Sequence, residues 1–81
     1  MNAQEIIKMN TPEIIDRTNS VYNIFKHTVR LNQYRFSGMT STETADLLIE
    51  LIGTDPTYIA KNYLIKRIES YSNEYDTGIY Y

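Results

Sequence analysis

The sequence contains no cysteine, and this absence excludes several classes of protein. Without thiols the chain can form no disulfide framework, no thiolate metal site and no cysteine nucleophile. It also contains a single histidine, His27, so a cluster of imidazole ligands is excluded as well. Any metal site would therefore have to be assembled mainly from carboxylates.

Long hydrophobic runs are missing too, and neither sign of charge dominates. The apolar run Leu47-Leu48-Ile49 ends at Glu50, far too short to cross a bilayer. Residues 1–20 show no basic start followed by an apolar stretch, so no secretory signal is expected. Eight Lys and Arg against ten Asp and Glu give a net charge of -2, which predicts no overall attraction to nucleic acid or to an anionic membrane. We therefore expect a cytoplasmic protein that is not bound to a membrane.

The 81 residues include only three Gly and two Pro, and the apolar residues recur mostly at helical spacing. No stretch alternates apolar and polar residues over five or more positions, so a sheet is not expected. The prediction is an all-α fold, a small bundle of three main helices at about 12–35, 42–52 and 56–73, with a short N-terminal helix at about 3–9. Residues 1–81 are expected to form a single helical domain, with 76–81 a loose or docked C-terminal tail.

The helix boundaries are predicted from residues that favour the first or last turn of a helix. A capping residue followed by proline opens two helices, at Thr11-Pro12 and at Asp55-Pro56. Thr40 and Glu43 have the spacing of a capping box, and Gly53 can take the positive φ that ends a helix.

Residues that could carry chemistry are few. Glu43, Asp46 and Glu50 lie three and four apart, so they share one helix face and could offer oxygen ligands to a divalent cation. A solvated helix face explains the same spacing without a ligand, and no calcium-loop or Glu-x-x-His motif supports a metal. His27 has no carboxylate four residues to either side that could orient it as a general base. We therefore expect no catalytic residues, no metal and no cofactor.

Basic residues gather in two segments despite the negative net charge. Lys26 and Arg30 lie in the first long helix, and Lys61, Lys66 and Arg67 lie in the last. If both groups lay on the same face of the protein, they could bind the phosphates of a nucleic acid.

Gly53 separates two predicted helices, with apolar residues before and after it at Leu48, Ile52 and Ile59. This arrangement resembles the helix-turn-helix motif of DNA-binding proteins, although three positions depart from it, namely Ile49, Thr54 and Asn62. The resemblance implies that Thr57 and Lys61 would lie at the start of the DNA-reading helix.

The aromatic residues point to a different kind of partner. Eight are Tyr, two are Phe and none is Trp, and four of the tyrosines fall near the end of the chain, at Tyr71, Tyr75, Tyr80 and Tyr81. Tyrosine joins an apolar ring to a hydroxyl, which suits protein interfaces. Leu47 and Leu51 lie on a different side of their helix from Leu48 and Ile52, so the neighbouring helices are not expected to cover both sides.

The sequence therefore favours a small non-enzymatic protein-protein interaction module, a regulator or inhibitor that binds a protein partner or itself as a homodimer. The residues expected to bind the partner are Leu47, Leu51, Tyr71, Tyr75, Tyr80 and Tyr81. The alternative is a helix-turn-helix-like DNA-binding regulator, which would use Lys26, Arg30, Thr57, Lys61, Lys66 and Arg67.

Overall fold

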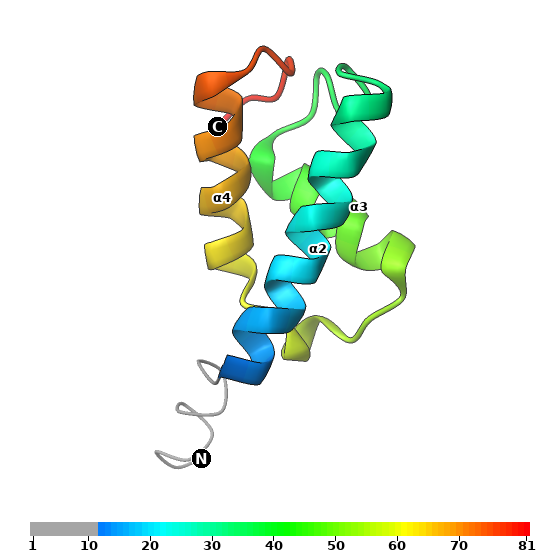
Figure 1. Ribbon diagram of the computed structural model, residues 1–81, viewed down its shortest axis with the longest axis vertical. Coiled ribbons are helices and arrows are strands. Elements are labelled where there is room, and N and C mark those ends of the chain that lie inside the picture. Colours follow the sequence, from blue (N-terminus) through cyan, green and yellow to red (C-terminus); the bar gives the residue numbers. More distant parts are fainter. Residues whose placement is uncertain (1–11) are drawn as a thin grey trace.

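The computed structural model describes residues 12–81, which form three helices in mutual contact (Figure 1). α2 spans Pro12–Leu31, α3 spans Ser41–Ile52, α4 spans Lys61–Glu74, and a short 3₁₀ turn, η1, spans Pro56–Tyr58. In Figure 1, α2 and α4 run side by side in the same direction and α3 lies across them. The expected helical fold is confirmed for 12–81, a range without strands. The predicted helix at 3–9 and the cap at Thr11 lie outside the described residues.

One hydrophobic core joins the helices around Phe25. The Phe25 side chain is fully buried, and its ring lies 5.9 Å from that of Tyr22, 5.7 Å from Phe36 and 5.4 Å from Tyr71, centroid to centroid. The other core members are Val21, Val29, Ala45, Leu48, Ile49, Ile59, Leu64, Ile68 and Ile79. Phe25 thus contacts its own helix, the segment that follows it and α4.

α2 ends at Leu31, so the prediction of a helix to position 35 is wrong. Asn32 redirects the chain because its side-chain oxygen accepts a hydrogen bond from the Tyr34 N–H, at 3.3 Å. Two further turn hydrogen bonds follow, from Arg35 N to Asn32 O and from Ser37 N to Tyr34 O. The turns bring Phe36 back onto the core, where it is 1% exposed. Burial of one aromatic ring thus accompanies the early end of the helix.

α3 begins and ends as its sequence predicts. Thr40 is the N-cap: its hydroxyl accepts from Glu43 N at 3.0 Å, and its own N–H donates to the Glu43 carboxylate at 2.9 Å. Gly53 ends the helix with φ of 76°, donating its N–H to the carbonyls of Ile49 and Glu50. The predicted capping box and C-terminal glycine are both confirmed.

The predicted helix at 56–73 is corrected to a single 3₁₀ turn, two non-helical residues and then α4. Asp55 caps the 3₁₀ turn by accepting from Thr57 N at 3.0 Å. Ile59 leaves the helical path with φ of -119° and ψ of 134°, and its side chain is buried in the core. The buried Thr18 hydroxyl accepts the Ala60 N–H at 2.9 Å, and Ala60 is the N-cap of α4. α4 thus begins without a side-chain cap of its own, and its N-cap residue is instead bonded to a side chain of α2.

The C-terminal tail is docked. Tyr80 N donates to Met39 O at 2.9 Å, and Ser41 N donates to Tyr80 O at 2.7 Å, so Thr40 and Tyr80 form an isolated parallel bridge. Gly38 N also donates to Gly78 O at 2.9 Å. Thr77 and Ile79 are buried, with exposures of 2% and 8%. Of the two states expected for residues 76–81, the structure has the docked one.

The close approach of the tail to Ser37 gives a stability prediction. Gly78 has φ of +72°, and a Cβ placed there would lie 2.8 Å from the Ser37 Cβ. Gly38 has a similar φ of +85°, but a Cβ there would meet nothing within 4 Å. We expect both alanine variants to lose roughly 1–2 kcal/mol from the positive φ, and Gly78→Ala to lose more because of the overlap. Urea denaturation of the two variants measures this difference; equal losses would show that the tail does not hold this position.

Candidate functional site

A hollow of about 510 Å³ lies between α2 and α4. One wall comes from α2, where Tyr22, Lys26 and Arg30 recur every fourth residue and therefore lie on one helix face. The other wall comes from α4, through Ser70, Tyr71, Glu74 and Tyr75. We call this hollow the Tyr-basic groove. It brings together residues from two separate predictions, Lys26 and Arg30 for nucleic acid and Tyr71 and Tyr75 for a protein partner.

Aromatic contacts with the core position the tyrosines of the groove. The Tyr71 ring meets Phe25 edge to face, at 5.4 Å and 84°, which fixes it on the core. Tyr75 lies one turn further along α4, and its ring is 4.6 Å from that of Tyr71. Tyr75 is 53% exposed. The groove therefore has an aromatic wall that is anchored at one end and open to solvent at the other.

Two cations lie over the ring of Tyr22, one of them Lys26 of the groove. The Lys26 Nζ lies 5.2 Å from the Tyr22 ring centroid. The Arg67 guanidinium lies 4.1 Å from the centroid of the same ring and also donates a hydrogen bond to Asn19. Among residues 12–81, neither Lys26 nor Arg30 takes part in an ion pair. Around Tyr22 the charge is thus locally positive, opposite to that of the whole chain.

The other basic residues named from the sequence lie elsewhere. Lys61 is at the start of α4 and pairs with Asp46 of α3, Nζ to Oδ1, at 2.6 Å. Lys66 lies 3.8 Å from Glu69 on its own helix. Thr57 is in η1, bonded to Asp55, and not at the start of a long helix. Because η1 and two non-helical residues precede α4, Thr57 and Lys61 do not share the first turn that the helix-turn-helix resemblance implies.

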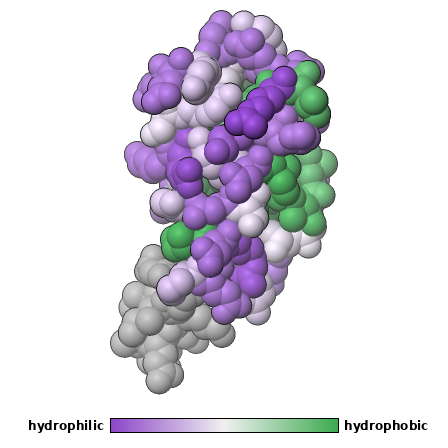
Figure 2. Space-filling view, viewed as in Figure 1, coloured by the Kyte–Doolittle hydropathy of each residue, from purple (hydrophilic) through white to green (hydrophobic). Residues whose placement is uncertain are grey.

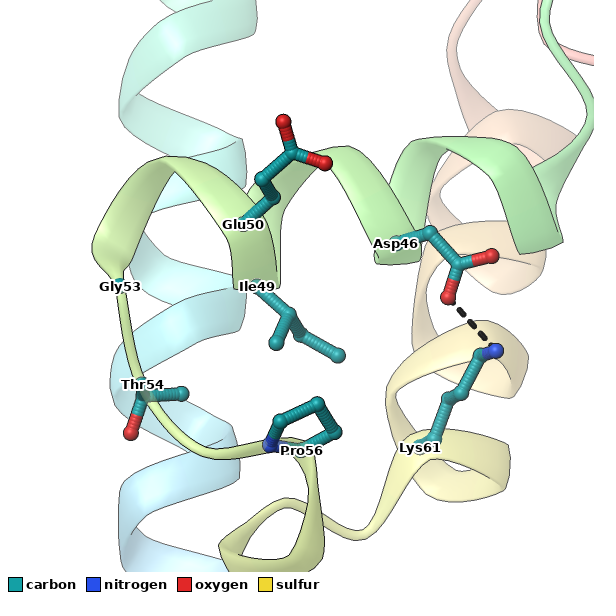
Figure 3. Close-up of a pocket in the computed structure, with 7 residues that line it drawn as sticks. All are labelled: Asp46, Ile49, Glu50, Gly53, Thr54, Pro56 and Lys61. Atoms are coloured by element: carbon teal, nitrogen blue, oxygen red, sulfur yellow. Dashed lines mark ion pairs between the residues drawn. The ribbon is translucent and has the colours of Figure 1, made fainter.

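A second hollow, of about 500 Å³, lies between the end of α3 and the start of α4 (Figure 3). Ile49 and Pro56 form its apolar floor, and the Asp46–Lys61 ion pair closes one side. In Figure 3 the Glu50 carboxylate points away from this floor. The charged groups of this hollow are thus either paired with each other or directed outward.

The three carboxylates considered for a metal have separate roles. Glu43 belongs to the capping box, Asp46 pairs with Lys61, and Glu50 is exposed. No group of three or more His, Asp or Glu suited to a metal ion occurs within residues 12–81. His27 is exposed on α2. None of the helices between Pro12 and Tyr81 has the length and apolar character needed to cross a membrane.

Exposed aliphatic side chains gather on α2 and α3. Ile24, Leu31, Leu51 and Ile52 are 45%, 77%, 64% and 38% exposed, and we call them the aliphatic face. Figure 2 shows hydrophobic side chains collected on the side that carries α3 and the C-terminal half of α2, while most of the same view is hydrophilic. Leu47, expected to be at a partner surface, is half-buried and packs against the core.

Tyr80 and Tyr81 end the docked tail but keep their side chains in solvent, at 62% and 61% exposure. They are not part of the Tyr-basic groove. Of the six residues predicted to bind a partner, Leu47 packs against the core, and the other five divide between the aliphatic face, the groove and the tail. Sequence reasoning missed Tyr22, Ser70 and Glu74 as groove residues; for Tyr22, its spacing of four from Lys26 was the available signal.

Comparisons with protein-family models, with curated proteins and with solved structures found no match for this chain. The functional inference therefore rests on the geometry alone.

Tyr22 gives a prediction about alkaline pH. Burial raises the pKa of Tyr22 above its ordinary value of 10.0, and the nearby Arg67 guanidinium opposes this rise. A raised pKa in the folded state means that the contribution of the neutral phenol to stability is complete below pH 10 and is lost as the pH rises through the folded pKa. We expect the unfolding free energy of the native chain to fall more steeply above pH 10 than that of Tyr22→Phe.

Denaturant titrations of both proteins across this pH range provide the measurement. Tyr34, whose pKa is raised by its hydrogen bond to Asp76, is present in both proteins, so the difference isolates Tyr22. Parallel pH profiles would contradict the assignment.

Proposed function

We propose that this protein is a small non-enzymatic interaction module, a regulator or inhibitor that binds a protein partner or a second copy of itself. The observation that carries the proposal is the aliphatic face. Leu31 and Leu51 expose more than half of their side chains while thirteen other hydrophobic residues form a core that excludes water. The core is thus complete without them, and they remain available to a partner.

Contact with water is unfavourable for exposed aliphatic side chains such as these. Burying a fully exposed Leu or Ile side chain contributes roughly 1.5–3 kcal/mol. A single exposed aliphatic residue is ordinary on a protein surface, whereas several on adjoining helices form a patch of the kind found at protein interfaces. Ile24 and Leu31 lie two turns apart on one side of α2, and Leu51 and Ile52 end α3. A partner that covered them together would gain from all four.

The terminal tyrosines support the same role. Tyr80 is held by backbone hydrogen bonds to Met39 and Ser41, so its exposed ring is presented from a fixed backbone. A preorganised aromatic side chain loses less conformational entropy on binding than one on a mobile tail. Because Ile79 is buried in the core, removing the whole tail would damage the fold, and point substitutions are the appropriate test.

Leu51→Asp tests the aliphatic face. The exposed position accepts the change without loss of core packing, so the variant should fold while its association weakens by about tenfold or more. Asn62→Asp is the matched control, because it adds the same charge at an exposed position of α4. Sedimentation velocity measures self-association, and capture from the native host measures partner binding. The proposal fails if Leu51→Asp and Leu31→Asp leave both readouts as they are in the control.

The alternative, a helix-turn-helix-like DNA-binding regulator, has less support. It needs Lys61, Lys66 and Arg67 to be available at the start of a long helix. Lys61 and Arg67 already contact Asp46, Tyr22 and Asn19. The interaction module therefore remains the first proposal.

Binding to duplex DNA separates the two functions. If the alternative were correct, a gel shift with duplex DNA at low salt would show a complex that weakens steeply as salt rises, because phosphate contacts release counterions. We expect no complex at low salt. A salt-sensitive shift that is lost in Lys61→Gln would favour the alternative.

A further inference from the structure

The Tyr-basic groove holds two cations with no carboxylate partner among residues 12–81. Lys26 and Arg30 are four apart on α2, so their side chains emerge on the same face, one turn from each other. An ammonium and a guanidinium in this arrangement can share one anionic group, and the planar guanidinium suits the paired oxygens of a phosphate. The α2 wall is therefore built to receive an anion.

The α4 wall presents two tyrosine rings, inclined at 34° to each other. Tyr71 is held edge-on against Phe25, and Tyr75 packs on Tyr71 with ring centroids 4.6 Å apart. Because Tyr75 is half exposed, one part of its ring is free to receive another planar group. Stacking on such a ring is the usual way in which proteins hold an unpaired base.

Glu74 lies on the same α4 wall, directly before Tyr75 in the chain, and its carboxylate narrows the choice of ligand. Its carboxylate repels a second carboxylate, so a peptide rich in Asp and Glu fits poorly. It can instead accept a hydrogen bond from an amino group. A ligand with a phosphate, a planar ring and an exocyclic amine satisfies Lys26 and Arg30, Tyr75 and Glu74 at once.

We propose that the Tyr-basic groove binds a nucleoside phosphate with an amino-bearing base, either as a free nucleotide or as one nucleotide of a single strand. The volume of about 510 Å³ falls within the range of ligand pockets, roughly 300–1,000 Å³. Bases inside a duplex are already stacked, so duplex nucleic acid does not present a free ring to Tyr75. The groove shares no residue with the aliphatic face. The nucleotide proposal can therefore be tested independently of the proposed interaction module.

The test is calorimetric titration of the full chain at low salt with adenosine monophosphate, adenosine, ribose 5-phosphate, a short single-stranded oligoadenylate and an acidic peptide. Adenosine monophosphate should bind more tightly than adenosine or ribose 5-phosphate, because only it offers both phosphate and base. Added salt should weaken it. If the oligoadenylate binds more tightly than the mononucleotide, the natural ligand is a single strand. If the two affinities are equal, the natural ligand is a free nucleotide. Both results support the proposed chemistry.

Two variants with matched controls locate the binding. Arg30→Gln and Tyr75→Leu should each weaken the affinity by roughly tenfold. Arg17→Gln removes the same charge from the other end of α2, and Tyr58→Leu removes a half-exposed ring from η1, so both should bind like the native chain. Thermal melting of each variant confirms that it is folded. Arg30 is exposed, so its variant tests the groove even if Tyr75→Leu is unstable.

Three results would overturn the proposal: no heat of binding with adenosine monophosphate or oligoadenylate, equal affinity for adenosine and its monophosphate, or a native-like affinity in Arg30→Gln. Binding of the acidic peptide without binding of either adenylate would assign the groove to a protein ligand instead.

Discussion

The ring of Phe25 contacts aromatic rings from three segments: Tyr22 on its own helix, Phe36 in the turn that follows and Tyr71 on α4. Each contact fixes a different feature of the molecule. Packing of Phe36 requires the chain to turn soon after Leu31, and packing of Tyr71 holds α4 against α2 along its C-terminal half. Tyr75 packs against Tyr71, and Tyr71 packs against Phe25. The outer wall of the Tyr-basic groove therefore depends on Phe25, whose side chain is fully buried and out of reach of a ligand.

The chain has a negative net charge, but the Tyr-basic groove contains two cations, Lys26 and Arg30, against one carboxylate, Glu74. Most acidic residues have partners or roles outside the groove, such as Glu43 in the cap of α3 and Asp46 against Lys61. Lys26 and Arg67 instead lie over the Tyr22 ring, whose π face attracts cations without cancelling their charge. Net charge therefore describes the whole surface and not this part of it.

The sequence predicts the helices well where the signal is local. The capping box at Thr40 and Glu43 and the left-handed Gly53 involve residues within a few positions of each other, and both are found as expected. The errors arise where distant contacts override local preference. Ile59 and Ala60 leave the helical path in favour of burial and a hydrogen bond to Thr18, a residue far back in the chain.

The groove shows the same limit. Lys26 and Arg30 could be placed on one face of a helix from their spacing, and so could Tyr71 and Tyr75 on another. That these two faces meet depends on the relative placement of α2 and α4, which the helical period does not determine. The two pairs therefore belonged to different functional hypotheses until the fold joined them.

The bridge between Thr40 and Tyr80 joins two backbone segments that are far apart in the chain and lie outside the helices. A helix can form from neighbouring residues alone, but this bridge requires Tyr80 to come close to Thr40, which happens only when the helices between them have packed together. We therefore expect helix formation to precede closure of the tail during folding. In the native state the same segment is expected to open before the helices separate, so that amide hydrogens of Tyr80 and Ser41 exchange by local release of the tail.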